Sequence, residues 1–296
     1  MTIEVAPTGQ ACGAEVTGID LSAPLSPTEV LALRHAWLEH HVLVFPDQHL
    51  TDHDQERFTL YFGPFGDDPY IEPIDGRDHV IAVHRRADET KSVFAEAWHS
   101  DWSFQVRPPD GSCLYGIEIP PVGGDTLFAN QHLALERMSP ELRTRIEGLT
   151  AVHSARFGYA PDSIYGQEDE SDRAMRIITS EAARDTHLHP LVRAHPETGR
   201  PGLFSCLGYI IGIEGMDDDE AGDLLRELLE WQTRDEFVYR HRWRPDMLVM
   251  WDNRSVLHRA TGGYEGHERL LYRTSIGAIA ESQPSLESLA KHRSRA

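Results

Sequence analysis

The N-terminal part of the chain alternates between helix and strand patterns. At Ser26-Pro27-Thr28-Glu29 a capping residue is followed three positions later by glutamate, with proline at the first helical position, which is typical of a helix N-terminus. Val30, Leu33 and Trp37 then recur at a spacing that places them on one face of that helix. The apolar run at 41–45 follows and predicts a buried strand.

From about residue 97 the pattern changes to short apolar segments separated by glycine and proline. Such segments predict short strands, and two helical patterns interrupt them, one opening at Ser139 and one over 217–231. No glycine-rich nucleotide-binding pattern follows a strand, so a doubly wound parallel sheet is disfavoured. We expect a mainly β barrel or sandwich with flanking helices. The predicted strands are Ser112–Ile119, Thr126–Ala129, Leu203–Cys206, Met247–Trp251 and Arg269–Ile276.

Composition and charge narrow the classes of partner. The 296 residues are 40% hydrophobic and carry a formal charge of −20, which opposes nucleic acids and anionic membranes as partners. No apolar run approaches the roughly 20 residues of a membrane span, and the N-terminus lacks the basic and apolar regions of a signal peptide. Because Cys12, Cys113 and Cys206 are scattered, we expect a cytoplasmic protein without disulfides.

The segment WHSDW at 98–102 contains a candidate metal-binding pair. In a strand, residues two apart point to the same side, so His99 and Asp101 would project together. His258, just past a predicted strand, is the best third ligand, and two imidazoles with one carboxylate form the facial triad of non-haem Fe(II) oxygenases. The alternative is that the pair only forms a hydrogen bond in a core. A second triplet, His195-Pro-Glu197, has the texture of a turn.

Two arginines in the last predicted strand suggest anion binding. Arg269 and Arg273 are four residues apart, so they share one strand face at a separation of about 13 Å. If that face is interior, two guanidinium groups are buried, which is rare without anions. The neighbouring sequence supplies no carboxylates for both, whereas small-molecule anions would. The alternative is an exposed face with solvated arginines.

Together these segments resemble the taurine/2,4-D dioxygenase (TauD/TfdA) family of Fe(II)/2-oxoglutarate-dependent oxygenases. They occur in the order and spacing of the family and cover most of residues 95–276. The matching segments are WHSDWSF (98–104), PPVGGDTLFAN (120–130), HPLVRAHPETGRPGLF (189–204), WDNRSVLHRA (251–260) and RLLYRTSI (269–276).

The resemblance implies a double-stranded β-helix, or jelly-roll, core with flanking helices. It also implies a dioxygenase that hydroxylates a small organic anion while converting 2-oxoglutarate to succinate and CO2. Arg269 and Thr126 would bind 2-oxoglutarate, and a planar guanidinium suits that role because it binds carboxylates bidentately. The implied Fe(II) ligands are His99, Asp101 and His258, and the implied substrate-binding residues are Arg273, Tyr159 and Tyr209.

The sequence departs from the taurine enzymes around the expected substrate anion. The segment FGPFGDDPY (62–70) lacks their histidine, and Ala95 stands where they have asparagine. Asp67 and Asp68 would repel a sulfonate if they faced the site. Taurine is therefore disfavoured, and another sulfonate, a sulfate ester or a carboxylate remains open. Retention of Asp101 disfavours halogenation.

Several alternatives and boundaries follow from the same residues. The chain is expected to form one domain, with an N-terminal α/β part (1–95) that packs on the jelly-roll core (96–280). An exposed loop is expected around 166–176, and residues 155–175 are a candidate lid. O2 is an expected partner, and a homo-oligomer is left open. The other functions considered are a jelly-roll metal hydrolase or isomerase that does not use 2-oxoglutarate, and a non-catalytic binding protein.

Overall fold

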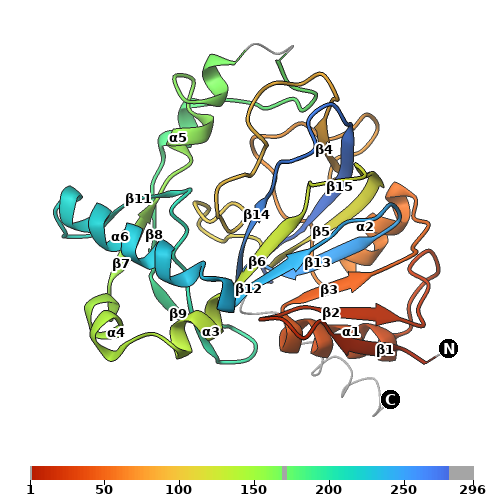
Figure 1. Ribbon diagram of the computed structural model, residues 1–296, viewed down its shortest axis with the longest axis horizontal. Helices are drawn as coiled ribbons and strands as arrows, with labels where there is room; N and C mark the ends of the chain where they lie inside the picture. Colours follow the sequence, from red (N-terminus) through yellow and green to blue (C-terminus); the bar gives the residue numbers. More distant parts are fainter. Residues whose placement is uncertain (1, 169–171, 280–296) are drawn as a thin grey trace.

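The computed structural model describes residues 2–168 and 172–279, and its centre is a seven-stranded sheet (Figure 1). The segment 1–95 supplies four strands of this sheet, so it is part of the core and does not merely pack on it. All strand pairs in the sheet are antiparallel except β2–β3. The strand order is β1 (Glu4–Pro7), β2 (Ala14–Thr17), β3 (Val42–Phe45), β13 (Leu248–Asp252), β5 (Gly111–Glu118), β15 (Arg269–Ile276) and β4 (Ile81–Arg85).

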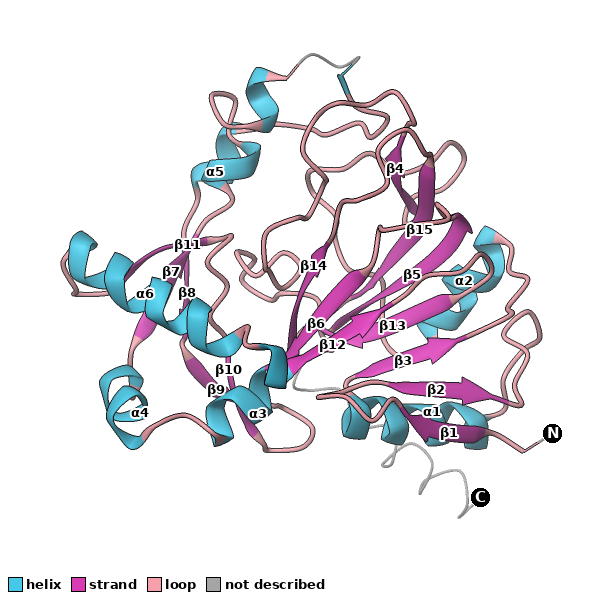
Figure 2. Ribbon diagram, in the orientation of Figure 1, coloured by secondary structure: helices cyan, strands magenta, loops and turns pink. Residues whose placement is uncertain are grey.

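Strands β3 and β13 are almost entirely apolar because both faces of the sheet are covered there. In β3, Val42 and Val44 point to the inner face of the sheet, which a second sheet covers, whereas Leu43 and Phe45 pack toward the helices. The side chains of β13 alternate between the two faces in the same way. The covering helices α1 (Pro27–His40) and α2 (Asp52–Leu60) are drawn on the outer side of the sheet in Figure 2.

Helix α1 has the N-terminus that its sequence predicts. The hydroxyl of Ser26 accepts a hydrogen bond from the backbone N–H of Glu29, and the Glu29 carboxylate accepts one from the N–H of Ser26. Val30, Leu33 and Trp37 are all buried on the sheet side. The predicted capping box, apolar face and following strand are therefore confirmed.

A second sheet closes the jelly roll over the inner face of the first. It is antiparallel, and Phe128 and Val256 pack with Leu114 and Trp251 of the main sheet. This sandwich confirms the predicted double-stranded β-helix. The strand order of the second sheet is β12 (Val238–His241), β6 (Thr126–Asn130) and β14 (Val256–Ala260).

A region rich in helices lies beside the second sheet and forms the left part of Figure 1. Its own apolar core joins the helices to short strands. The strand expected at 203–206 lies earlier, as β10, because its hairpin partner β9 pairs with 201–203. The elements are α3 (Gln131–Glu136), α4 (Pro140–Ile146), β7 (Thr150–His153), α5 (Arg156–Tyr159), η1 (Tyr165–Gln167), η3 (Glu181–Arg184), β8 (His187–Pro190), β9 (Val192–Ala194), β10 (Pro201–Leu203), β11 (Ile210–Ile213), α6 (Asp218–Gln232) and η4 (Asp235–Phe237).

The loop expected at 166–176 is less exposed than its polarity indicates. Residues 169–171 lie outside the described residues, but Arg173 is buried and forms hydrogen bonds with Glu168 and with the backbone of Ser92. The prediction of an exposed segment is wrong for Arg173 because distant carboxylate and carbonyl oxygens compensate the burial of its charge. The proposed lid role of 155–175 stays a prediction.

Candidate metal and cosubstrate site

Three buried side chains converge beside β14, the edge strand of the second sheet. The ligand atoms of His99, Asp101 and His258 all lie within 4.8 Å of one another. The Nε2 atoms of His99 and His258 are 3.6 and 3.5 Å from Oδ1 of Asp101. Ligand bonds of about 2.0–2.2 Å to one divalent cation would place donor atoms about 2.8–3.6 Å apart, from octahedral to tetrahedral angles. The predicted convergence of the three residues is therefore confirmed.

The route to this convergence differs from the expected strand. His99 forms only an isolated antiparallel bridge with His258, with reciprocal backbone hydrogen bonds of 3.0 and 2.7 Å, and Asp101 lies in the turn that follows. Trp102, in the same turn, has a φ of 45°, in the left-handed region. The strand prediction is wrong here because the chain turns immediately after one bridge, which brings Asp101 back toward both imidazoles.

The protonation chemistry of the three residues fits a divalent cation. His99 donates its Nδ1 proton to the carbonyl oxygen of Ala97, at 2.9 Å, which leaves the Nε2 lone pair free. Burial, reinforced by nearby His99, lowers the pKa of His258 to about 4, so its imidazole is neutral at neutral pH. Burial alone would raise the pKa of Asp101, but His258 and Arg273 hold it well below its usual range. Two imidazoles and one carboxylate are the donor set for non-haem Fe(II).

Arg269 is a buried cation without a carboxylate partner. Its Nη2 donates to the carbonyl oxygen of Gly124 at 3.2 Å, its Nε has no hydrogen-bond partner, and no ion pair to it forms within the described ranges. Gly124 has a φ of 67°, and a Cβ there would lie 3.0 Å from Arg269 Nε, so glycine permits the approach. Burial lowers the pKa of Arg269 to about 10. The residue is thus suited to an external anion.

Thr126 adds a second buried donor in β6. Its Oγ1 accepts a hydrogen bond of 2.9 Å from the indole Nε1 of Trp243, so its own hydroxyl proton is free to donate. Trp243 is a residue that sequence reasoning missed. Its position in a loop after β12, 117 residues from Thr126, gave no local signal.

Nearly the whole chain matches one protein family. The model of the taurine catabolism dioxygenase TauD, TfdA family matches residues 4–275. The chain belongs to this family. The predicted membership and the predicted jelly-roll core are confirmed.

Similar proteins support a 2-oxoglutarate-dependent dioxygenase. An alkylsulfatase of Acinetobacter baylyi is 34% identical over 89% of this chain and 81% of its own. An alpha-ketoglutarate-dependent 2,4-dichlorophenoxyacetate dioxygenase of Cupriavidus pinatubonensis is 37% identical, over 88% and 92%. The solved structure of AAD-2 in complex with Mn(II) and N-oxalylglycine has a TM-score of 0.79 and 30% identity, over 94% and 99%. This TauD/TfdA protein is therefore a 2-oxoglutarate-dependent dioxygenase, and the alternative of a hydrolase or isomerase is not supported.

The carboxylate of Asp101, the candidate metal ligand, is oriented by residues that sequence reasoning missed. Ser112 Oγ donates to Asp101 Oδ2 at 2.6 Å, and Asn253 Nδ2 donates to Ser112 Oγ at 3.1 Å. Oδ1 of Asp101 faces both histidines. The Asn253 carbonyl also accepts a hydrogen bond of 2.8 Å from Ser100 Oγ. These contacts fix the rotation of the Asp101 carboxylate.

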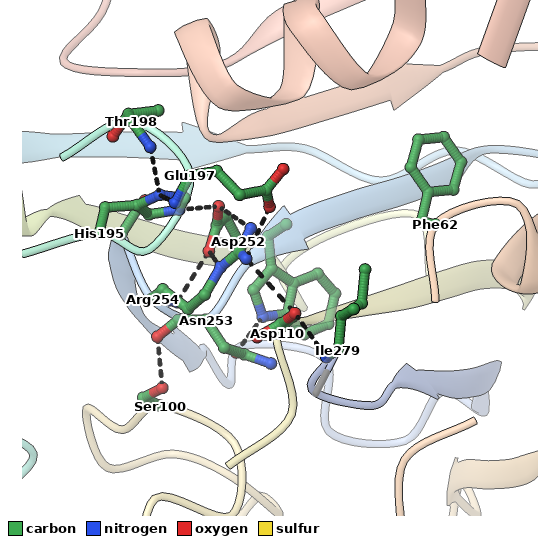
Figure 3. A network of polar contacts seen from close by, with 12 residues as sticks. Phe62, Ser100, Asp110, His195, Glu197, Thr198, Asp252, Asn253, Arg254 and Ile279 are labelled. Carbon is green, nitrogen blue, oxygen red and sulfur yellow. Dashed lines mark hydrogen bonds and ion pairs between the residues drawn. The ribbon is translucent and has the colours of Figure 1, made fainter. Parts of the chain in front are cut away.

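A buried ion network holds the turn that carries Asn253 (Figure 3). Asp252 accepts hydrogen bonds from Arg254 Nε at 2.8 Å and Nη2 at 2.9 Å, and its Oδ2 lies 2.9 Å from His195 Nε2. Burial would raise the pKa of Asp252, but Arg254 and His195 hold it far below its usual range. His195 does begin a turn, as predicted, yet it is buried against Asp252. Its texture revealed the turn but not this distant partner.

Arg273 already has carboxylate partners, contrary to the expectation that small-molecule anions supply them. Its Nη2 forms a short ion pair with Asp68, and its Nη1 lies 3.4 Å from Oδ1 of Asp101. Burial opposes the charge, but Asp68 and Asp101 raise the pKa of Arg273. The inward-facing arginine pair is confirmed, because both side chains are buried. The need for external anions holds for Arg269 alone.

Tyr159 is buried and Tyr209 is half-buried, and Tyr209 lies beside the triad. The ring of Tyr209 lies edge-on to His99 with centroids 6.4 Å apart, and Tyr159 stacks on Tyr70 with centroids 4.7 Å apart. Burial raises the pKa of both tyrosines, so both are neutral. Their role as substrate-contacting walls stays a prediction.

Within residues 2–168 and 172–279, no helix combines the length and apolar character that a membrane span requires.

Proposed function

We propose that this dioxygenase uses Fe(II) and 2-oxoglutarate to hydroxylate a small organic anion, with release of succinate and CO2. The proposal depends on two features of the same protein. One is the buried cluster of two histidines and one carboxylate, and the other is Arg269, a buried guanidinium that has no carboxylate partner among the described residues. The cluster fits one metal ion and leaves coordination positions open. Arg269 fits the distal carboxylate of an oxo diacid.

The residues of the chain have separate tasks in this proposal. His99, Asp101 and His258 hold the metal, which supplies the redox chemistry when bound with 2-oxoglutarate and O2. Arg269 and the free hydroxyl proton of Thr126 bind the distal carboxylate of 2-oxoglutarate. Because these donors are buried, the carboxylate is held with little competition from water.

The substrate class is proposed from the relatives and from the charge of the site. One relative is named an alkylsulfatase and another a 2,4-dichlorophenoxyacetate dioxygenase. We therefore propose that the substrate is a sulfate ester, a sulfonate or a carboxylate. Arg273, Tyr159 and Tyr209 are the proposed contacts of this substrate. We place the enzyme in the reducing cytoplasm because its cysteines are all free and buried. A homo-oligomer is compatible with the proposal.

The test combines metal-site variants with a spectroscopic measurement. His99→Ala and Asp101→Ala should abolish the weak visible charge-transfer band that appears when 2-oxoglutarate is added to the Fe(II) protein without O2. They should also abolish O2-dependent succinate formation during a screen of sulfates, sulfonates and carboxylates. His49→Ala is the control, because His49 is exposed on the surface and lies outside the cluster. Wild-type band intensity and succinate yield in Asp101→Ala would refute the proposal.

A further inference from the structure

The carboxylate of Asp68 lies in a cradle of donors that resembles an anion-binding site. It pairs with Arg273 Nη2, and its Oδ1 accepts a hydrogen bond of 2.7 Å from the indole Nε1 of Trp102. The hydroxyl of Ser275 lies 3.1 Å from its Oδ2. A guanidinium, an indole N–H and a hydroxyl around one carboxylate are the donors that would bind a sulfate or carboxylate of a substrate.

The backbone fixes Asp68 in this cradle. The N–H of Gly66 donates to the carbonyl oxygen of Ser275 at 2.9 Å, and Phe65 forms a bridge with Ile276. A Cβ on Gly66 would lie 3.1 Å from the Cβ of Ser275, so glycine allows the loop to lie directly on β15. Asp68 follows two residues later, with a side chain only 10% exposed.

The two buried arginines of β15 therefore differ in charge balance. Arg269 has no carboxylate partner among the described residues, whereas Arg273 contacts both Asp68 and the metal-ligand carboxylate Asp101. A substrate anion that approached Arg273 would meet a guanidinium whose charge is already compensated. Repulsion by Asp68 at close range in a buried site would further weaken binding of that anion.

We infer that Asp68 occupies the anion-binding position on Arg273 and is a specificity-determining residue, because an anionic substrate must displace it to bind there. This inference rests on the proposed function, since it concerns how the proposed anion reaches the site. A small anion gains little by displacing Asp68, because it only replaces one anionic partner of Arg273 with another. An anion attached to a larger organic group gains additional contacts, so Asp68 selects such substrates against small anions.

The test compares anion binding in matched charge variants. Asp68→Asn removes the charge but keeps an acceptor oxygen for Trp102. Asp67→Asn makes the same charge change one residue earlier, where the side chain is exposed. Each protein is loaded with Mn(II) and 2-oxoglutarate and titrated with methyl sulfate in a calorimeter. Asp68→Ser, which vacates the position, repeats the test with a smaller side chain.

The expected result is that Asp68→Asn and Asp68→Ser bind methyl sulfate at least about tenfold more tightly than the wild type. Asp67→Asn should stay within about twofold, because exposed charge is screened by salt. Equal affinity in all proteins would overturn the inference, as would weaker binding by the Asp68 variants. A separate calorimetric titration of each Mn(II)-loaded protein with 2-oxoglutarate, made before methyl sulfate is added, measures 2-oxoglutarate binding. Wild-type protein that fails to bind 2-oxoglutarate would refute the proposed function instead.

Discussion

Replacement of Arg254 by methionine tests the buried network beneath the metal site. The guanidinium of Arg254 forms hydrogen bonds with Asp252 and Glu197 and lies 3.4 Å from Asp110 Oδ2. Arg254→Met keeps a long apolar side chain but leaves three carboxylates without this cation. Removal of one partner from a buried ion pair costs about 3–5 kcal/mol, so the free energy of unfolding should fall by about that amount.

The pH dependence of this loss has a definite sign. In the wild type, Arg254 and His195 hold the pKa of Asp252 far below its usual range, so the stability it contributes is present above about pH 4 and lost at lower pH. Without Arg254, burial raises the pKa of Asp252 and Asp110, and the variant loses stability as pH rises. The difference between the two proteins should therefore be larger at pH 8 than at pH 5.5.

Urea unfolding at these two pH values, followed by tryptophan fluorescence, measures the effect. The control is Arg145→Met, because Arg145 forms a 2.8 Å ion pair with Glu227 in which both side chains are nearly half exposed. That variant should lose no more than about 1 kcal/mol. A loss below about 1 kcal/mol in Arg254→Met at pH 8, or an identical loss at both pH values, would refute the reasoning.

Two further variants separate residues that orient ligands from residues that stabilise the fold. Ser112→Ala should weaken Mn(II) binding by about 10- to 100-fold, because Asp101 loses the hydrogen bond that fixes its rotation. Calorimetry measures this, and an unchanged dissociation constant would contradict it. The control is Ser103→Ala, because Ser103 is also a buried serine but its hydroxyl contacts His153 Nδ1 at 3.0 Å. Arg269→Leu should weaken 2-oxoglutarate binding by at least about 100-fold yet change the stability of the ligand-free protein by less than about 1 kcal/mol, because no carboxylate partner is lost. The comparison is Arg273→Leu, which leaves the Asp68 carboxylate without its cation and should therefore unfold at a clearly lower urea concentration. An equal loss of stability in the two leucine variants would contradict the assignment.

Local sequence signals predicted the elements whose determinants are local. The Ser26 capping box and the apolar face of α1 lie within one helix, so their residues carry the whole pattern. The resemblance of several motifs in order predicted the jelly roll and the three residues that the fold brings together as candidate metal ligands. The strand expected around His99 did not form because its pairing partner is β14, and nothing within 97–102 encodes where that pairing ends.

Partners distant in the chain account for what the sequence did not reveal. Asp68 and Arg273 are 205 residues apart, and His195 and Asp252 are 57 apart. Each polar group by itself is compatible with exposure or burial, and only the packing of loops on the sheets decides which carboxylate meets which cation. The sequence indicates that the acidic residues at 67–68 disfavour a sulfonate, but only the fold shows that Asp68 forms an ion pair with Arg273.

The reciprocal backbone hydrogen bonds between His99 and His258 join two proposed metal ligands that are far apart in the sequence. Both imidazoles are therefore delivered by one pair of opposing peptide groups, and any local opening that separates the 97–101 segment from β14 dismantles the coordination sphere at the same moment. Hydrogen–deuterium exchange of these two amides would accordingly report metal release directly, and bound metal should slow the exchange of both amides together.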